Sequence, residues 1–261
     1  NIVDLLKTMP VPKYPDYDRT AILFNDDTLA AQPYDAKRPY GEQTESCYTL
    51  LGPVARSWFK FIDCTQVIAW PSLRERFDII YLPTARYQRA EIVEKLMAFV
   101  RDGGTLVCGD PHAFETDIYG ADTSGRRDEL FGVKTGEAHA APVTVTTSQR
   151  NLGGELTVIG DALSLQAPGP VPVLARYADG NPAIVSNKYG EGTAILFGFN
   201  PFSFAAIEQE RWREFFTELA GMLGQPTALD TWRFTLPDSV ICEEPEDVGV
   251  CLTNNRVIWR E

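Results

Sequence analysis

Hydrophobic and polar positions follow a strand–helix–strand pattern near the middle of the chain. Residues 78–82 form a short apolar run before Pro83, which is typical of a buried strand. Over residues 88–102 apolar side chains recur at helical spacing: Ile92, Val93, Leu96, Phe99 and Val100. Gly103 is placed to end that helix, and residues 105–108 form a second apolar run. This order predicts a right-handed parallel crossover.

The same alternation extends toward the N-terminus. Residues 20–24 are predicted to form a strand, and a long polar loop is expected from residue 25 to about residue 43. Residues 44–61 have the pattern of a helix that contains Gly52 and Pro53, and residues 64–70 are predicted as a strand. The repeated alternation predicts an α/β fold with a mostly parallel, doubly wound, flavodoxin-like sheet and helices on both faces.

The second half of the chain is mainly strand-like. Five apolar runs follow residue 142, and they predict an added antiparallel β layer whose last strand, residues 193–199, returns to the main sheet: VTVTT, ELTVIG, VPVLARYA, AIVSNKYG and TAILFGFN. Residues 210–223 have the pattern of an amphipathic helix.

Three segments follow from these patterns. Residues 1–19 read as a linker or the tail of a preceding element, and residues 20–226 as one α/β domain. Residues 227–261 read as a C-terminal β segment or as the start of a further β-domain, with two apolar arms around Asn254 and Asn255.

Charge and composition narrow the classes of partner and site. The 261 residues carry a net charge of −12, which argues against nucleic acid or an anionic membrane as a partner. No run approaches the roughly 18–20 apolar residues of a membrane-spanning helix. Five cysteines without CxxC spacing predict no zinc cage, and no metal or cofactor is expected. Whether Cys242 and Cys251 form a disulfide, and in which cellular compartment the protein lies, stay open at this point.

The candidate binding residues follow three predicted strands. Open α/β sheets hold ligands at the carboxyl ends of their strands, and this set of polar side chains suits a sugar: Asn25, Asp26, Asp27, Asp110, His112, Glu115, Asp117 and Asn200. A solvated surface is the alternative interpretation of the same residues. Three residues at or near the turn after residue 108 are candidates for catalysis: Cys108, Asp110 and His112. The other histidine, His139, is predicted to lie in a surface loop.

Several phrases of the sequence resemble a known family. DIIYLPTA, then DGGTLVCGDP, then RRDELFGV resemble the class I glutamine amidotransferase-like fold. ARYADGNPAIVSNKYGEGTAILFGF is similar to the β-galactosidase trimerisation domain, the version of that fold found in glycoside hydrolases. The resemblance covers about residues 20–224.

The resemblance implies a fold that has lost amidotransferase chemistry. Catalytic relatives place a cysteine nucleophile on the turn after a strand, whereas Asp110 occupies that position here and Cys108 lies before it. Where relatives have His-Pro-Glu, this chain has Asn200, Pro201 and Phe202. A carboxylate cannot replace the thiolate, and two of the three triad positions are therefore unsuited to the reaction.

The expected function is a non-catalytic structural or interaction module of a carbohydrate-active enzyme. Such a module would join domains of the enzyme or subunits of a homo-oligomer, and would help to complete a sugar-binding cleft. Two alternatives stay open. One is a hydrolase in its own right that uses Cys108 or Asp110 with His112, and the other is a sugar-binding sensor.

Overall fold

The computed structural model describes residues 19–32, 41–148, 152, 154–225, 249–253 and 256–260. Almost all of the predicted linker lies outside the described residues, as do Cys242 and most of the predicted C-terminal segment. Among the described residues, no helix is both long enough and apolar enough to cross a membrane.

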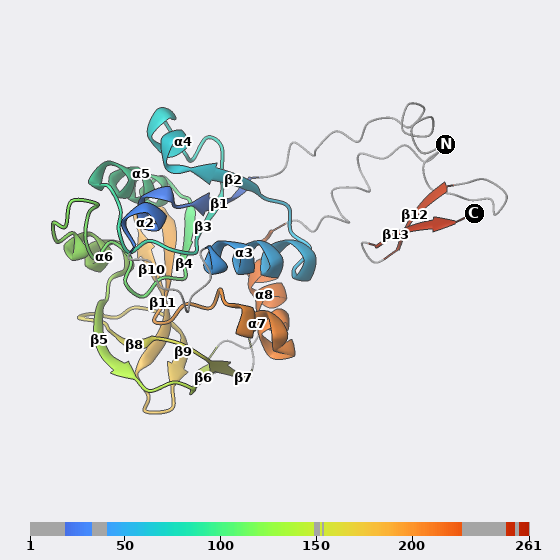
Figure 1. The fold of residues 1–261 in the computed structure, drawn as a ribbon. Helices are drawn as coiled ribbons and strands as arrows, with labels where there is room; N and C mark the ends of the chain where they lie inside the picture. The colour runs from blue at the N-terminus through green and yellow to red at the C-terminus, as the bar shows by residue number, and fades with distance from the viewer. Residues whose placement is uncertain are drawn as a thin grey trace.

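A nine-stranded sheet forms the centre of the molecule, in the order β2-β1-β3-β4-β11-β10-β9-β6-β7 (Figure 1). Its first five strands are mutually parallel, and they are β2 (Lys60–Asp63), β1 (Thr20–Phe24), β3 (Ile79–Leu82), β4 (Thr105–Cys108) and β11 (Gly192–Phe197). The predicted strand–helix–strand order and the parallel pairing are confirmed, because α5 (Ala90–Arg101) connects β3 to its parallel neighbour β4. The predicted return of the last strand is also confirmed, since β11 pairs with β4.

The predicted antiparallel layer is mostly a continuation of this sheet, which corrects the expectation. Four antiparallel strands extend it beyond β11: β10 (Pro182–Tyr189), β9 (Val173–Tyr177), β6 (Val143–Thr147) and β7 (Glu155–Val158). Within the predicted antiparallel region, β5 (Lys134–His139) and β8 (Ala162–Gln166) form a separate two-stranded sheet. The fold is therefore mixed α/β, with one large, mostly parallel sheet and additional antiparallel strands.

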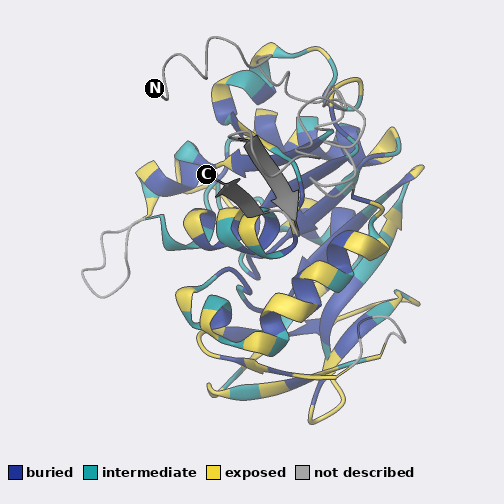
Figure 2. Cartoon of the chain, turned by 90° about the vertical axis from the view of Figure 1, so that its right-hand side faces the viewer, coloured by how far each residue is buried: buried dark blue, intermediate teal, exposed yellow. Residues whose placement is uncertain are grey.

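Helices cover both faces of the sheet, as predicted. Strand side chains alternate between two buried clusters, with Ile80 in one and Tyr81 in the other. The Ile80 cluster includes residues of α5 and of two further helices, α4 (Cys64–Ala69) and α6 (Ser124–Phe131). The Tyr81 cluster includes residues of α3 (Glu42–Thr49), η1 (Leu50–Val54), α7 (Phe204–Glu208) and α8 (Glu210–Met222). Figure 2 shows the helices with exposed outer sides over this buried centre.

Near the N-terminus one predicted element is wrong, and a second is confirmed only over residues 44–54. Residues 64–70 were expected to be a strand, but residues 64–69 form the whole of α4, and the strand is the preceding segment, β2. A capping box decides this, because Asp63 accepts from the Gln66 backbone N–H while the Gln66 side chain accepts from the Asp63 N–H. The predicted helix over 44–61 ends at Val54, where Pro53 lies in a π-helical turn and lacks an N–H to donate.

The predicted polar loop after β1 begins with a helix instead. Asn25 accepts a hydrogen bond from the Thr28 backbone N–H at 3.2 Å and so caps α2 (Asp26–Ala31). At the other end of the chain, β12 (Gly249–Thr253) and β13 (Arg256–Arg260) pair antiparallel, as the two apolar arms predicted.

Candidate functional site

A cleft of about 340 Å³ lies at the carboxyl ends of the parallel strands. Thr84 follows β3, Asp110 and His112 follow β4, and Asn200 follows β11, so the loops of three neighbouring strands meet there. The other residues that line it are mainly polar: Gln32, Glu42, Gln43, Arg86, Tyr87, Pro111, Ile159, Gly160, Asp161, Phe202 and Ser203.

Asp110 connects two of these loops. Its carboxylate accepts from the Ala85 backbone N–H at 2.7 Å and from the His112 backbone N–H at 2.9 Å. The residue is only 8% exposed, and burial raises the pKa of its carboxyl group, while the two backbone N–H groups oppose that rise. Asp110 thus fixes the turn after β4 against the loop after β3.

Cys108 ends β4 inside the hydrophobic core. Its side chain is fully buried, and the thiol donates to the Asp110 carbonyl oxygen at 3.7 Å. Burial raises the pKa of the Cys108 thiol far above its usual range, and the Asp110 carboxylate raises it further. The thiolate needed for nucleophilic attack is therefore strongly disfavoured at neutral pH.

His112 is oriented by a charged neighbour at the mouth of the cleft. Its Nδ1 lies 3.1 Å from a Glu115 carboxylate oxygen, and the Arg86 Nε lies 2.9 Å from the same oxygen. The Arg86 guanidinium also lies 5.6 Å from the centre of the Tyr87 ring. Arg86 and Tyr87 were not among the predicted site residues, although both follow β3 and the same carboxyl-end rule applies to them.

Asn200 and Asp117 have structural hydrogen bonds of different kinds. Asn200 donates to the Pro83 carbonyl at 2.9 Å and accepts from the Phe202 N–H at 2.9 Å, which ties the turn after β11 to the end of β3. Asp117 accepts from two backbone N–H groups of an exposed turn, those of Tyr119 and Ala121. The structure thus gathers Asp110, His112 and Asn200 around one cleft, while Asp117 lies in a separate turn.

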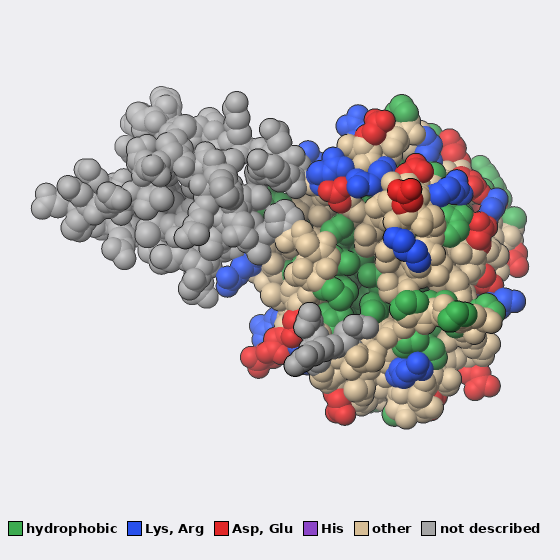
Figure 3. All heavy atoms as spheres, turned by 180° about the vertical axis from the view of Figure 1, so that it is seen from behind, with side chains coloured by type: hydrophobic (Ala, Val, Ile, Leu, Met, Phe, Trp, Pro, Cys, Tyr) green, Lys and Arg blue, Asp and Glu red, His purple; other side chains and the backbone are tan. Residues whose placement is uncertain are grey.

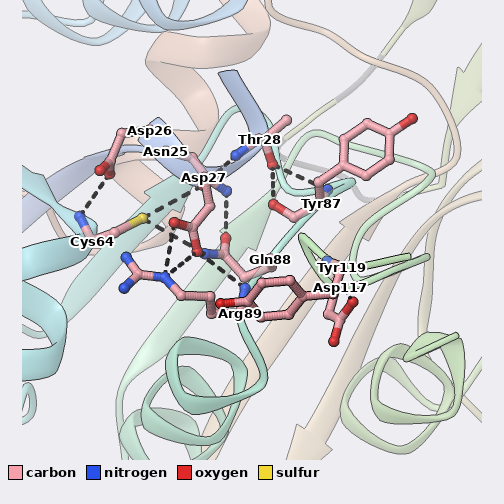
Figure 4. Close-up of polar contacts among 10 residues, drawn as sticks. All are labelled: Asn25, Asp26, Asp27, Thr28, Cys64, Tyr87, Gln88, Arg89, Asp117 and Tyr119. Carbon is pink, nitrogen blue, oxygen red and sulfur yellow. Dashed lines mark hydrogen bonds and ion pairs between the residues drawn. The ribbon is translucent and has the colours of Figure 1, made fainter. Parts of the chain in front are cut away.

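The other predicted binding residues belong to a buried network beside the cleft (Figure 4). Asn25 is fully buried, and its amide donates to the Thr84 carbonyl at 2.8 Å and to the side chain of Gln88. Asp27 accepts from the Gln88 amide at 3.1 Å and pairs with the Arg89 Nε at 2.9 Å. These contacts hold the loop after β3 against the start of α2.

One group in this network has the donor atoms of a metal site. The ligand atoms of Asp26, Asp27 and Cys64 all lie within 4.8 Å of one another. The Arg89 guanidinium, however, already supplies the positive charge beside Asp27. Burial, with the Asp26 hydrogen bond next in size, raises the pKa of the Cys64 thiol to about 12, so the thiolate ligand is disfavoured. The cluster fits a structural network better than a metal centre.

The prediction for His139 is wrong. The residue ends β5 rather than lying in a loop, and its ring centre is 4.0 Å from that of Tyr177 on β9. Its Nδ1 lies 3.8 Å from a carboxylate oxygen of Asp179. The residue pattern of β5 gave no sign of this strand, because it has no alternation of apolar and polar side chains.

A family model matches most of the chain. Residues 18–224 match the family described as the β-galactosidase trimerisation domain. No curated protein sequence matches the chain.

Solved structures with a similar fold include glycoside hydrolases. A GH42 β-galactosidase from G. stearothermophilus matches with a TM-score of 0.63 and 21% identity over 80% of this chain and 30% of its own. A β-galactosidase from the haloarchaeon Halorubrum lacusprofundi matches with a TM-score of 0.67 and 18% identity, over 90% of this chain and 34% of its own. A cytoplasmic protein from Salmonella typhimurium matches over 98% of its length with a TM-score of 0.53 and 10% identity. The chain thus spans about a third of the two β-galactosidases, and these identities establish the fold alone.

Proposed function

The chain belongs to the β-galactosidase trimerisation domain family, and from this premise we propose that it is a non-catalytic assembly module of a glycoside hydrolase. The match over residues 18–224 is the observation that carries the proposal. The module brings subunits or domains of the enzyme together, and the reaction itself belongs to other parts of that enzyme. The limited coverage of the two β-galactosidases is consistent with a module of a larger protein.

An exposed aromatic patch supports association with a second copy of the chain. Phe24, Tyr48 and Phe61 are 41%, 46% and 48% exposed, and the Tyr48 and Phe61 rings stack with centres 6.1 Å apart. They border an apolar groove of about 450 Å³ that also includes Glu45. Exposed apolar patches of this kind are typical of protein–protein contacts. On the face seen in Figure 3, hydrophobic side chains gather near the middle, and most charged groups lie around them.

Native mass spectrometry tests the assembly proposal. We expect the wild-type chain to have the mass of three copies, and Phe61→Ser to shift the population toward one copy because it removes apolar area from the patch. Tyr119→Ser is the matched control, since Tyr119 is 87% exposed and is not one of the residues that border the groove. A single copy for the wild-type chain at every concentration would contradict the proposal.

We also propose, as the finer interpretation, an amidotransferase-like fold whose catalytic groups have been replaced. Asp110 follows β4 and Asn200 follows β11, and in this proposal they stand in for the nucleophile and the histidine of catalytic relatives. The deep burial of Cys108 and its hydrogen bond to Asp110 support this interpretation, because this thiol is enclosed in the hydrophobic core. The purified chain should release no ammonia from glutamine, and measurable release would overturn this part.

A hydrolase that uses Cys108 or Asp110 with His112 is the competing proposal. The His112 imidazole approaches Glu115, and Asp110 accepts from backbone N–H groups, so their observed partners favour a structural role. The hydrolase is favoured if the wild-type chain turns over an aryl galactoside and the His112→Ala variant does not. If the chain is instead an assembly module, the loop over residues 112–125 is a candidate for completing the sugar-binding cleft of the glycoside hydrolase to which the module belongs.

A further inference from the structure

The cleft between the loops after β3, β4 and β11 has the dimensions and chemistry of a small-molecule site. Its volume of about 340 Å³ lies within the roughly 300–1,000 Å³ that is usual for such pockets. Amide, hydroxyl, imidazole and carboxylate groups line it, so hydrogen-bond donors and acceptors are both present. The partly exposed Tyr87 ring adds apolar surface.

One buried polar group on the cleft wall has an unused hydrogen-bonding capacity. Thr84 lines the cleft and is 5% exposed, yet its hydroxyl has no hydrogen-bond partner among the described residues. Buried hydroxyls nearly always have a partner, from the protein, from water or from a ligand. The oxygen itself is almost fully covered, so a ligand hydroxyl supplies this partner only with a small shift of the cleft wall.

Asp110 offers the second anchor. Each carboxylate oxygen already accepts one backbone N–H, from Ala85 or from His112, and each retains a further lone pair. Because these contacts fix the carboxylate in place, its free lone pairs have a defined direction before any ligand binds. Fixed acceptors of this kind favour a ligand with several hydroxyl donors.

The charges around the cleft select against anions. Among the described residues that line the cleft, Arg86 is the one arginine, and there is no lysine. The Arg86 guanidinium is paired with Glu115. Glu42, Asp110 and Asp161 line the same space, and the whole chain carries a net charge of −12. A phosphate or carboxylate ligand would therefore meet acidic groups and a cation that already has a partner.

We infer that this cleft binds a neutral polyhydroxy molecule of monosaccharide size, with Asp110 and Thr84 as hydrogen-bonding anchors and Tyr87 as an apolar wall. The inference goes beyond assembly and does not depend on it, since the cleft is built from one chain.

Titration calorimetry of the full chain tests the inference, with galactose, glucose and mannose at millimolar concentration and inorganic phosphate as the anionic probe. We expect saturable heat from at least one of the hexoses and none from phosphate. Thr84→Val keeps the shape of the side chain and removes the hydroxyl, so it should weaken hexose binding about fivefold or more without lowering the thermal midpoint. His112→Ala tests the mouth of the cleft, where we expect weaker binding.

Asp117→Asn is the matched control, because Asp117 lies in the exposed turn and is not one of the residues that line the cleft. It should bind as the wild type does. The inference is overturned if no hexose gives saturable heat, if phosphate competes with the hexose, or if Thr84→Val and His112→Ala both bind like the wild type. The number of chains in the complex is measured on the same samples by native mass spectrometry. A failure of sugar binding is therefore distinguished from a failure of assembly.

Discussion

Gly192 leaves no room for a side chain where β11 begins. A Cβ atom there would lie 2.0 Å from the Val100 carbonyl oxygen and 2.2 Å from that of Gly104, and neither backbone can move away cheaply. Gly192→Ala should therefore lower the free energy of unfolding by about 3 kcal/mol or more, measured by urea denaturation.

Gly221 provides the matched control for this prediction. It lies in α8, and a Cβ atom there would meet nothing within 4 Å. Gly221→Ala should stabilise the protein by about 0.5–1 kcal/mol, because alanine loses less backbone entropy in a helix. Equal effects of the two substitutions would contradict the close packing of β11 on the end of α5.

The thiols of the α/β core are expected to be unreactive in the folded protein. Cys47, Cys64 and Cys108 are fully buried, and burial raises the pKa of each, that of Cys64 to about 12. Iodoacetamide at pH 8 should label these three only after unfolding, as peptide mass spectrometry would show. Rapid labelling of Cys108 in the native protein would instead indicate an accessible thiolate and would favour the hydrolase.

At the scale of secondary-structure elements, an ion-pair cluster joins the starts of β1 and β3. Arg19 donates to Asp78 at 2.7 Å and 3.0 Å, and Arg74 donates to the same carboxylate. The hydrogen bond from Arg19 is the largest cause that lowers the pKa of Asp78 below 3.8. A lowered folded-state pKa adds stability above the unfolded-state pKa, and this stability is lost as the pH falls through the folded-state value.

We therefore expect Asp78→Asn to reduce the loss of stability below about pH 4, because the substituted chain no longer takes up this proton on unfolding. Thermal midpoints of the two proteins from pH 2 to pH 7 would measure the difference. The effect should be small, since the Asp78 side chain is 47% exposed and solvent screens the pair. If the thermal midpoints of the two proteins fall by the same amount below pH 4, the stabilising role of this ion-pair cluster is contradicted.

The elements that the sequence predicted well are those with long, regular periodicity. α5 shows five apolar side chains at helical spacing, and its bounds differ from the expected ones by no more than two residues. The stretch from Cys64 to Trp70 misled the prediction, because Val67 and Ile68 favour strands while the capping box of Asp63 and Gln66 starts a helix. The pairing of β5 with β8 depends on distant residues, which local patterns do not contain.

The candidate site could be predicted only in part for the same reason. The rule that ligands bind at the carboxyl ends of strands led to Asp110, His112 and Asn200, which do line one cleft. It could not separate them from Asn25 and Asp27, which also follow a strand but turn inward to a buried network. Which polar side chains face a cleft depends on partners such as Gln88 and Arg89, and only the folded chain brings these together.

At the scale of the whole molecule, association must overcome like charge. Copies that each carry a net charge of −12 repel one another, so contact is favoured where apolar surface outweighs charge. The patch of Phe24, Tyr48 and Phe61 meets that requirement, with Glu45 as the acidic residue that borders the groove. Higher salt should therefore strengthen association by screening the repulsion.

Sedimentation equilibrium of the chain over a wide range of concentrations tests the central claim, self-assembly through this domain, most directly. At micromolar concentration and physiological salt, the account predicts a mass of three chains that falls toward one chain on dilution. A mass of one chain that stays constant up to the highest concentration and salt would contradict it.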